Sequence, residues 1–204
     1  RVWNDAMAEV RADVRRGLAK LGNETAWTPE HFELGFGLKN ADSDPASQEE
    51  PVLLDFGLSL RGSIDAVERT ADQVRATDYK TGEPRRDGVV LDGGKFLQPV
   101  FYALALEKIF PHLSSAGGRA YYCTTRGRFQ SVNVPASEQS RGAAARVHAI
   151  IGQALNEGFL PAAPERDACA RCEFQRVCGP YELERTARKD PPRHAVLQGV
   201  RRMV

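Results

Sequence analysis

The sequence predicts an α/β protein in which a mixed, mainly antiparallel sheet is flanked by helices. Residues 4–21, 95–110 and 137–158 repeat apolar side chains every three or four positions, which is typical of amphipathic helices. Between them lie shorter runs with the alternation or composition of strands: 31–38, 52–60, 59–68, 73–79, 117–123 and 129–134. The order is helix, several strands, helix, two strands, helix, and this order favours helices packed on a sheet.

Each helix has an apolar stripe that we expect to face the core. The first helix ends at the Gly22-Asn23 signal and should pack on the rest of the chain without a chemical role. Its inward residues should be Met7, Val10, Val14, Leu18 and Leu21. Those of the later helices should be Phe96, Leu97, Val100, Phe101 and Leu104, and then Ala144, Val147, Ile150, Ile151 and Leu155.

Composition limits the classes of function. The 204 residues include 28 basic and 27 acidic side chains, a net charge of +1, so nucleic-acid binding would need a local basic patch. No apolar run approaches the roughly 20 residues of a membrane span, and the N-terminus has no signal pattern, so we expect a cytoplasmic protein. Because the chain starts at Arg1, we expect the N-terminal part of the protein to lie upstream.

The predicted hairpin 59–68/73–79 carries charged residues of the types that can bind a metal ion and support catalysis. Asp65 lies on its first arm, and Asp78 and Lys80 lie at the end of its second arm. Side chains alternate along a strand, so Asp78 and Lys80 should point to the same side. Two carboxylates suit Mg²⁺ or Mn²⁺, and a lysine can orient the attacking water or offset phosphorane charge. This chemistry cleaves phosphodiesters.

Three motifs in this order resemble those of the PD-(D/E)XK nucleases, in the RecB/AddB-like branch: Gly62-x-x-Asp65, Asp78-x-Lys80 followed by Thr81-Gly82, and Gln98-x-x-x-Tyr102. The likeness extends from about residue 33 to residue 178. It implies a restriction-endonuclease-like core. It also implies a metal-dependent DNA nuclease, of exonuclease type, that acts in DNA repair or recombination with a helicase subunit or domain.

The resemblance also implies roles for individual residues. Asp65 and Asp78 would bind Mg²⁺ or Mn²⁺, with the Tyr79 carbonyl as a further oxygen ligand. Lys80 would position or activate the water. The helix pair Gln98 and Tyr102, which are four residues apart and share a face, would line the cleft and position the scissile strand.

Other residues near these motifs have more open interpretations. Glu33 stands where the family often has an acidic residue on the first strand, and it is either functional or a charge at a strand edge. The family's upstream helix supplies a further metal ligand, a role that we assign to neither Glu9 nor His31. The polar loop 82–94 contains Arg85 and Arg86, which are either phosphate contacts or surface charges. The polar, acidic segment 39–51 should be a flexible surface loop.

Three of the four cysteines are clustered as Cys169-x-x-Cys172-x5-Cys178. In a reducing compartment this spacing indicates metal ligation, by Zn²⁺ or an iron–sulfur cluster. In the resembling nucleases the same segment joins a cysteine N-terminal to the core to hold a [4Fe–4S] cluster. Here that partner lies upstream of Arg1, or Cys123 replaces it, or the segment has no cluster. If Cys123 is not a ligand, we expect it to be a small buried core residue.

The sequence therefore divides into a nuclease core, residues 1–165, and a cysteine-containing segment with a tail, residues 166–204. Two other functions remain open. One is a catalytically inactive, nuclease-like domain that binds or scaffolds DNA. The other is a zinc-stabilised interaction module built on the cysteine segment.

Overall fold

The computed structural model describes residues 2–39, 44–164, 168–179, 181–189 and 191–203. Its centre is a five-stranded sheet in the order β1-β4-β5-β6-β7. The strands are β1 (Thr28–Phe36), β4 (Gly62–Arg69), β5 (Gln73–Lys80), β6 (Ser114–Tyr122) and β7 (Ser131–Pro135). The β5–β6 pair is parallel and the other three pairs are antiparallel. This confirms the predicted α/β class with a mixed, mainly antiparallel sheet.

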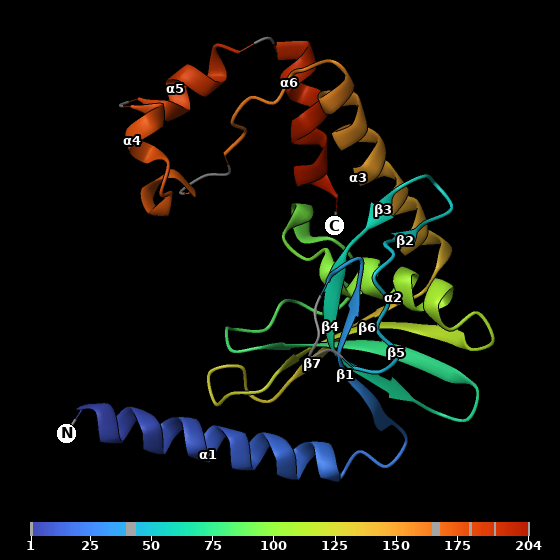
Figure 1. Cartoon of the computed structure of the whole chain (residues 1–204). Helices are drawn as coiled ribbons and strands as arrows, with labels where there is room; N and C mark the ends of the chain where they lie inside the picture. Colours follow the sequence, from blue (N-terminus) through green and yellow to red (C-terminus); the bar gives the residue numbers. More distant parts are fainter. Residues whose placement is uncertain (1, 40–43, 165–167, 180, 190, 204) are drawn as a thin grey trace.

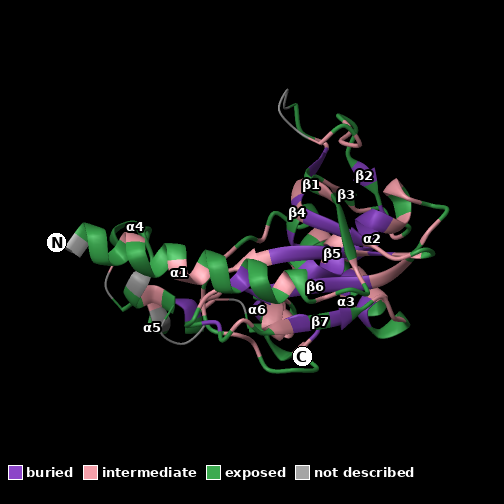
Figure 2. Ribbon diagram, turned by 90° about the horizontal axis from the view of Figure 1, so that it is seen from below, coloured by how far each residue is buried: buried purple, intermediate pink, exposed green. Residues whose placement is uncertain are grey.

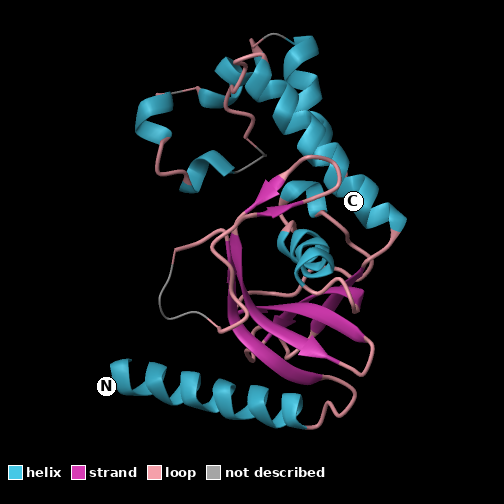
Figure 3. Cartoon of the chain, turned by 45° about the vertical axis from the view of Figure 1, so that its right-hand side comes forward, coloured by secondary structure: helices cyan, strands magenta, loops and turns pink. Residues whose placement is uncertain are grey.

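Helices lie on both faces of the sheet (Figures 1 and 3). α1 (Val2–Gly22) lies under one face, whereas α2 (Gln98–Ile109) and α3 (Glu138–Asn156) lie on the opposite side. α2 connects the two parallel strands β5 and β6, as such a crossover requires. The side chains of Ser137 and Ser140 form a capping box that starts α3.

α2 approaches β6 very closely, and Gly118 permits this approach. A Cβ atom at Gly118 would overlap the backbone of Pro99 in the first turn of α2. We therefore expect Gly118→Ala to destabilise the protein by about 1–3 kcal/mol in urea unfolding. The control is Gly152→Ala in α3, where a Cβ meets nothing within 4 Å. That substitution should stabilise by roughly 0.5–1 kcal/mol, and equal effects at both positions would contradict the packing argument.

The prediction of a single strand over residues 52–60 is wrong, because this segment forms two short strands that fold back on each other. It forms β2 (Val52–Leu53) and β3 (Ser59–Leu60), which pair with each other. The backbone reverses between them through hydrogen bonds between Leu54 and Leu58 (2.9 Å) and from Gly57 to Leu54 (2.9 Å). Gly57 has φ +87°, a conformation that glycine adopts without strain.

The loop expected to be flexible is held to the sheet in its described part, residues 44–51. The Asp44 carboxylate accepts hydrogen bonds from the backbone of Ala46 (2.9 Å) and Phe32 (3.3 Å), and it lies 2.9 Å from His31 Nδ1. Burial would raise the pKa of Asp44, but these hydrogen bonds outweigh it and lower the pKa. One further acidic residue of this segment, Asp42, lies outside the described residues.

α1 touches the body of the protein along a face different from its apolar stripe. Asp13 accepts hydrogen bonds from Thr125, and Gly17 lies against Cys123. The predicted inward residues Val10, Val14 and Leu18 are instead 56%, 53% and 64% exposed. Figure 2 shows most of α1 in the colour of exposed residues. The expectation that this stripe packs within the chain is therefore wrong for these residues. In α3, Ile151 and Leu155 are likewise exposed, whereas Ala144, Val147 and Ile150 are buried as expected.

The sheet face toward α1 holds a buried ionic cluster. Arg119 is 2% exposed, and its guanidinium contacts Glu68 (2.6 Å), Glu24 (2.7 Å) and Thr77 (3.0 Å). Arg75 contacts the other oxygen of Glu68 at 2.7 Å and Glu24 at 2.5 Å. Two cations therefore balance two carboxylates, and the cluster joins the end of α1 to β4, β5 and β6.

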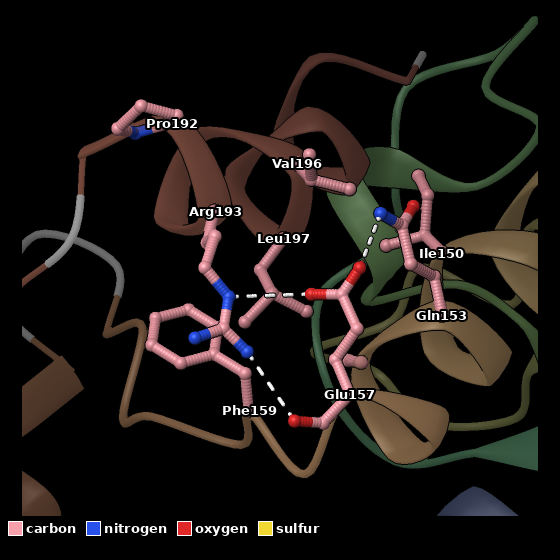
Figure 4. A pocket seen from close by; sticks show the side chains of 9 residues that line it. Ile150, Gln153, Glu157, Phe159, Pro192, Arg193, Val196 and Leu197 are labelled. Carbon is pink, nitrogen blue, oxygen red and sulfur yellow. Dashed lines mark hydrogen bonds and ion pairs between the residues drawn. The ribbon is translucent and has the colours of Figure 1, made fainter.

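The C-terminal part of the chain forms short helices, of which only α6 and η3 fall in the stretch after residue 188 that was expected to be a tail. Its elements are η2 (Ala168–Arg171), α4 (Gln175–Cys178), α5 (Glu182–Ala187), α6 (Pro191–Gln198) and η3 (Gly199–Arg202). Figure 4 shows how α6 docks on the end of α3. Arg193 lies 3.2 Å from the Glu157 carboxylate and stacks over the Phe159 ring at 4.1 Å.

η3 then packs on the short helix η1 (Asp92–Gly94) in the loop between β5 and α2. The backbone N–H of Gly93 donates to the carbonyl of Met203 at 2.7 Å, and Arg201 donates back to the carbonyl of Gly93 at 3.2 Å. Gly93 has φ +62°, and a Cβ there would lie 3.1 Å from the Arg201 carbonyl. The C-terminal end of the chain therefore fixes the loop that follows Lys80.

Candidate active site

The hydrogen-bond ladder between β4 and β5 ends where the two aspartates stand. The last ladder pair is Ala66–Thr77, and beyond it the backbone N–H of Tyr79 donates to a side chain, Asp65 Oδ2, at 2.8 Å. Asp78 is the neighbour of Thr77 and faces the α2 side of the sheet, as Asp65 does. The structure thus brings the two predicted carboxylates to one place.

Lys80 links the carboxylates to α2. Its Nζ lies 2.6 Å from Asp78 Oδ2 and donates a hydrogen bond to Gln98 Oε1 at 2.7 Å. The Gln98 amide in turn lies 3.5 Å from the hydroxyl of Tyr102. Contacts between side chains therefore join Asp78, Lys80, Gln98 and Tyr102, and Asp65 completes the cluster through the Tyr79 backbone and its electrostatic interaction with Asp78.

α2 can bring Tyr102 near β4 because Gly62 has no side chain. A Cβ at Gly62 would lie 3.2 Å from the Phe36 ring and 3.3 Å from the Tyr102 ring. The two rings themselves meet edge to face with centroids 6.3 Å apart. Gly62 of the sequence motif therefore has a packing role that positions the helix side of the cluster.

Asp78 is in an unfavourable environment for a free carboxylate. It is 4% exposed, and Lys80, whose Nζ lies 2.6 Å from its Oδ2 in a hydrogen-bonded ion pair, is the polar partner described for that oxygen. Burial raises the pKa of Asp78, and the nearby Asp65 adds to the rise, although Lys80 opposes it. A buried carboxylate oxygen with so few partners fits a site that a cation completes.

Asp65 and Asp78 fit the ligand chemistry of Mg²⁺ or Mn²⁺, because Mg²⁺ is commonly held by one or two carboxylates and retains several waters. In the described ranges, no three His, Cys, Asp or Glu side chains are grouped so as to hold a metal ion. Within these ranges Asp65 and Asp78 form a pair of carboxylates, and the Tyr79 backbone lies beside Asp65.

The raised pKa of Asp78 predicts a pH dependence. A carboxyl with a raised pKa stays protonated to higher pH than an ordinary aspartate, whose value is 3.8, and a protonated carboxyl is a poor ligand. We expect Mn²⁺ affinity, measured by titration calorimetry, to fall with decreasing pH at a higher pH than for a site made of ordinary aspartates. A constant affinity down to the ordinary aspartate value would contradict this.

Glu33 lies beside the carboxylate pair in the strand register. It stands between the pairs Phe32–Ala66 and Leu34–Ile64, which places it across from Asp65 on β1. Its backbone has φ +51°, which is uncommon for a residue other than glycine, and its carboxylate accepts a hydrogen bond from Ser63 at 3.2 Å. Strained residues of this kind cluster at functional sites, so Glu33 remains a candidate.

The two loop arginines differ in the structure. Arg85 is half-buried, is ion-paired with Asp92 and donates its backbone N–H to the Tyr122 hydroxyl at 3.2 Å. Arg86 is exposed. Lys95, for which the sequence predicted no role, lines a cavity together with Lys80, Arg85 and Gln98. The one feature of the sequence that could have indicated a role for Lys95 is its position three residues before Gln98.

The cysteines are in two places. Cys169 lies in η2, Cys178 ends α4, and Cys172 lies between these two elements, where its backbone N–H donates to the Cys169 carbonyl at 3.2 Å. Slight burial raises the pKa of Cys169, as do the nearby Glu182, Cys172 and Cys178. As placed, these thiols do not form a ligand set for a metal.

Cys123 lies at the end of β6 instead. Its backbone N–H and thiol both contact the carbonyl of Lys80, at 2.9 and 3.5 Å. Burial raises the pKa of this thiol, and Asp13 and Asp65 add to the rise. Cys123 is half-buried, and these contacts attach it to the backbone of Lys80.

A mixed sheet with a crossover helix, two carboxylates and a lysine at the end of adjacent strands is the architecture of a phosphodiester-cleaving α/β nuclease. Residues 2–179 match the family model of the PD-(D/E)XK nuclease superfamily, and the chain belongs to this superfamily. The fold accordingly is restriction-endonuclease-like, as the resemblance implied. A comparison with curated proteins gives no match. None of the helices in the described ranges is long and apolar enough to cross a membrane.

Proposed function

We propose that the chain is the nuclease domain of a metal-dependent DNA exonuclease of the RecB/AddB-like branch, acting in DNA repair or recombination with a helicase subunit or domain. The observation that carries the proposal is the continuous cluster of Asp65, Asp78, Lys80, Gln98 and Tyr102 at the end of the β4–β5 ladder. Superfamily membership supports nuclease activity and a DNA substrate.

In this proposal Asp65 and Asp78 hold Mg²⁺ or Mn²⁺, with the Tyr79 carbonyl as a further oxygen. The Tyr79 N–H fixes one oxygen of Asp65 at 2.8 Å, which leaves the other oxygen to bind. A bound ion supplies positive charge for the phosphoryl oxygens and lowers the pKa of a water. Its positive charge also favours the ionised form of Asp78, which burial disfavours.

Lys80 has two acceptors in the cluster, Asp78 and Gln98, which hold its ammonium between the carboxylates and α2. From there it can hold the attacking water or offset charge on the phosphorane. Gln98 orients Lys80, and Gln98 and Tyr102 position the scissile strand. In this proposal the aspartates bind the metal ion, and the lysine positions the attacking water.

We also propose the division into a core, residues 1–165, and a cysteine-containing segment, residues 166–204. The cysteine spacing supports metal binding by Cys169, Cys172 and Cys178, as part of a [4Fe–4S] cluster or, as the alternative, a zinc site. Metal analysis of anaerobically purified protein distinguishes them, because a cluster gives a brown protein and zinc a colourless one. Protein free of both metals would contradict the proposal.

The direct test of the function is cleavage of end-labelled single- and double-stranded DNA with Mg²⁺, Mn²⁺ or EDTA. We expect cleavage with either ion and none in EDTA. Mononucleotides or short products from one labelled end would support exonuclease action, whereas internal cuts would overturn it. DNA binding without cleavage, at saturating Mn²⁺, would favour the alternative of an inactive scaffold domain.

A further inference from the structure

The short helix η3 lies against η1, the turn that leads into α2 (Figure 1). η3 follows the part of the chain that matches the nuclease family model. Its contact holds η1 in two ways, because the Gly93 N–H donates to the Met203 carbonyl at 2.7 Å and Arg201 donates to the Gly93 carbonyl at 3.2 Å. A second nitrogen of the Arg201 guanidinium donates to the Ala163 carbonyl at 3.3 Å. Arg201 therefore ties η1 to the segment that follows α3.

The backbone of η1 needs support from its surroundings. Three consecutive residues have a positive φ: Asp92 at +45°, Gly93 at +62° and Gly94 at +86°. Glycine adopts such angles readily, but aspartate does so at a cost, and a strained conformation persists only where neighbouring groups fix it. Val200 and Met203 supply such neighbours, since both pack against the hydrophobic core. A Cβ at Gly94 would lie only 2.9 Å from the Val200 side chain.

η1 connects directly to the start of α2. The backbone N–H of Phe96 donates to the Leu91 carbonyl at 3.0 Å, and both side chains are buried. Two residues after Phe96, Gln98 opens α2 and accepts the 2.7 Å hydrogen bond from Lys80. A displacement of η1 would therefore move Gln98 and change the direction in which the Lys80 ammonium points.

We propose that Arg201 is a positioning residue of the candidate active site. It holds η1, and through η1 the start of α2, in the place where Gln98 orients Lys80. The inference rests on the proposed function and adds to it a residue that lies outside the family match. The proposed metal ligands, Asp65 and Asp78, stand on β4 and β5 and not on α2. Loss of Arg201 should therefore slow cleavage without weakening the binding of Mn²⁺.

The test compares single-turnover cleavage of end-labelled DNA, at saturating DNA and Mg²⁺, by the full chain and by its Arg201→Ala variant. A displacement of about 1 Å caused by a distant substitution can cost about 100-fold, so we expect the rate to fall at least ~10-fold. Mn²⁺ affinity, from titration calorimetry, should equal that of the wild type. Arg201→Lys keeps a donor for the Gly93 carbonyl and should recover part of the rate. Arg202→Ala is the matched control, since it removes the same charge from an exposed neighbour that lines a different cavity with Arg146.

The contact can also be tested from the side of η1. Gly93→Ala places a Cβ 3.1 Å from the Arg201 carbonyl, whereas Gly88→Ala, in the same loop and at φ +79°, meets nothing within 4 Å. Both substitutions strain the backbone, so slower cleavage by Gly93→Ala than by Gly88→Ala isolates the contact with η3. The losses from Gly93→Ala and Arg201→Ala should not add in the double variant, because both substitutions disturb the same contact.

Hydrogen exchange of the Gly93 amide gives a readout that does not depend on catalysis. Exchange should be about tenfold faster in Arg201→Ala than in the wild type and unchanged in Arg202→Ala, because only the first variant loses the charged donor beside this amide. Unchanged exchange in Arg201→Ala, cleavage at the wild-type rate, or an equal loss of Mn²⁺ affinity and rate would overturn this inference and leave the nuclease proposal intact. A wild-type protein that cleaves DNA with neither ion would overturn both proposals.

Discussion

Asp78→Asn is expected to remove DNA cleavage and, in EDTA, to make the protein more stable. A residue that only supports a metal ligand costs up to about 100-fold when replaced, so loss of a proposed ligand should cost at least ~100-fold in rate. The gain in stability has a separate origin. The raised pKa of Asp78 means that the fold favours the protonated carboxyl over the ionised one.

The sign of the stability effect follows from this pKa. Because the pKa in the folded state is above that of the unfolded chain, the stabilising contribution exists at low pH and is lost as pH rises through the folded value. At neutral pH the ionised Asp78 therefore costs stability, and a neutral asparagine removes that cost. Added Mn²⁺ should raise the melting temperature of the wild type and not that of the variant.

The matched control is Asp87→Asn, which makes the same change on an exposed residue of the neighbouring loop. It should leave cleavage and melting temperature near wild-type values. An Asp78→Asn protein that is less stable than wild type in EDTA would contradict the stability prediction. A variant that still cleaves DNA at the wild-type rate would contradict the role of Asp78 in cleavage.

Arg119→Met should cause the largest loss of stability. Removing one partner from a buried ion pair leaves the other charge uncompensated and costs about 3–5 kcal/mol. Here Glu68, at 2% exposure, would lose one of its two arginines. For a chain of this size the melting temperature should fall by roughly 6–20 °C, at about 2–4 °C per kcal/mol.

The comparison variant is Arg69→Met, which breaks an ion pair with Glu30 whose side chains are 39% and 38% exposed. Exposed pairs of this kind contribute about 0–1 kcal/mol, so the melting temperature should barely change. A similar decrease for both variants would show that the buried cluster has no special role. Calorimetry on the two proteins measures both effects.

The same cluster makes the attachment of α1 sensitive to acid. Burial would raise the pKa of Glu24, but hydrogen bonds from Arg75 and Arg119 outweigh it and lower the pKa. The contribution of Glu24 to stability is therefore present above the pKa of the unfolded chain and disappears as pH falls through the folded value.

The strands and the candidate site could be predicted from the sequence because their signals are local. The hairpin that became β4 and β5 has alternating side chains, and alternation alone puts Asp78 and Lys80 on one side. α2 follows directly along the chain, so the spacing of Gln98 and Tyr102 sufficed to place them together.

Other features depend on partners far away in the sequence. Arg119 meets Glu24 across 95 positions, and nothing near either residue indicates the pairing. The C-terminal residues bind Gly93 in the middle of the chain, a contact that only the folded structure reveals. The apolar stripe of α1 was misleading for a related reason, since periodicity predicts a helix face but does not say what covers it.

The most direct test of the central claim is single-turnover cleavage by Lys80→Ala at saturating Mg²⁺, with Mn²⁺ affinity measured on the same protein. The account predicts Mn²⁺ affinity at least equal to that of the wild type, because both aspartates remain and a neighbouring cation is gone. Cleavage should fall by about 10²–10⁴-fold, the usual contribution of a group that handles a proton. Cleavage at the wild-type rate would contradict the assignment of this cluster as the catalytic centre.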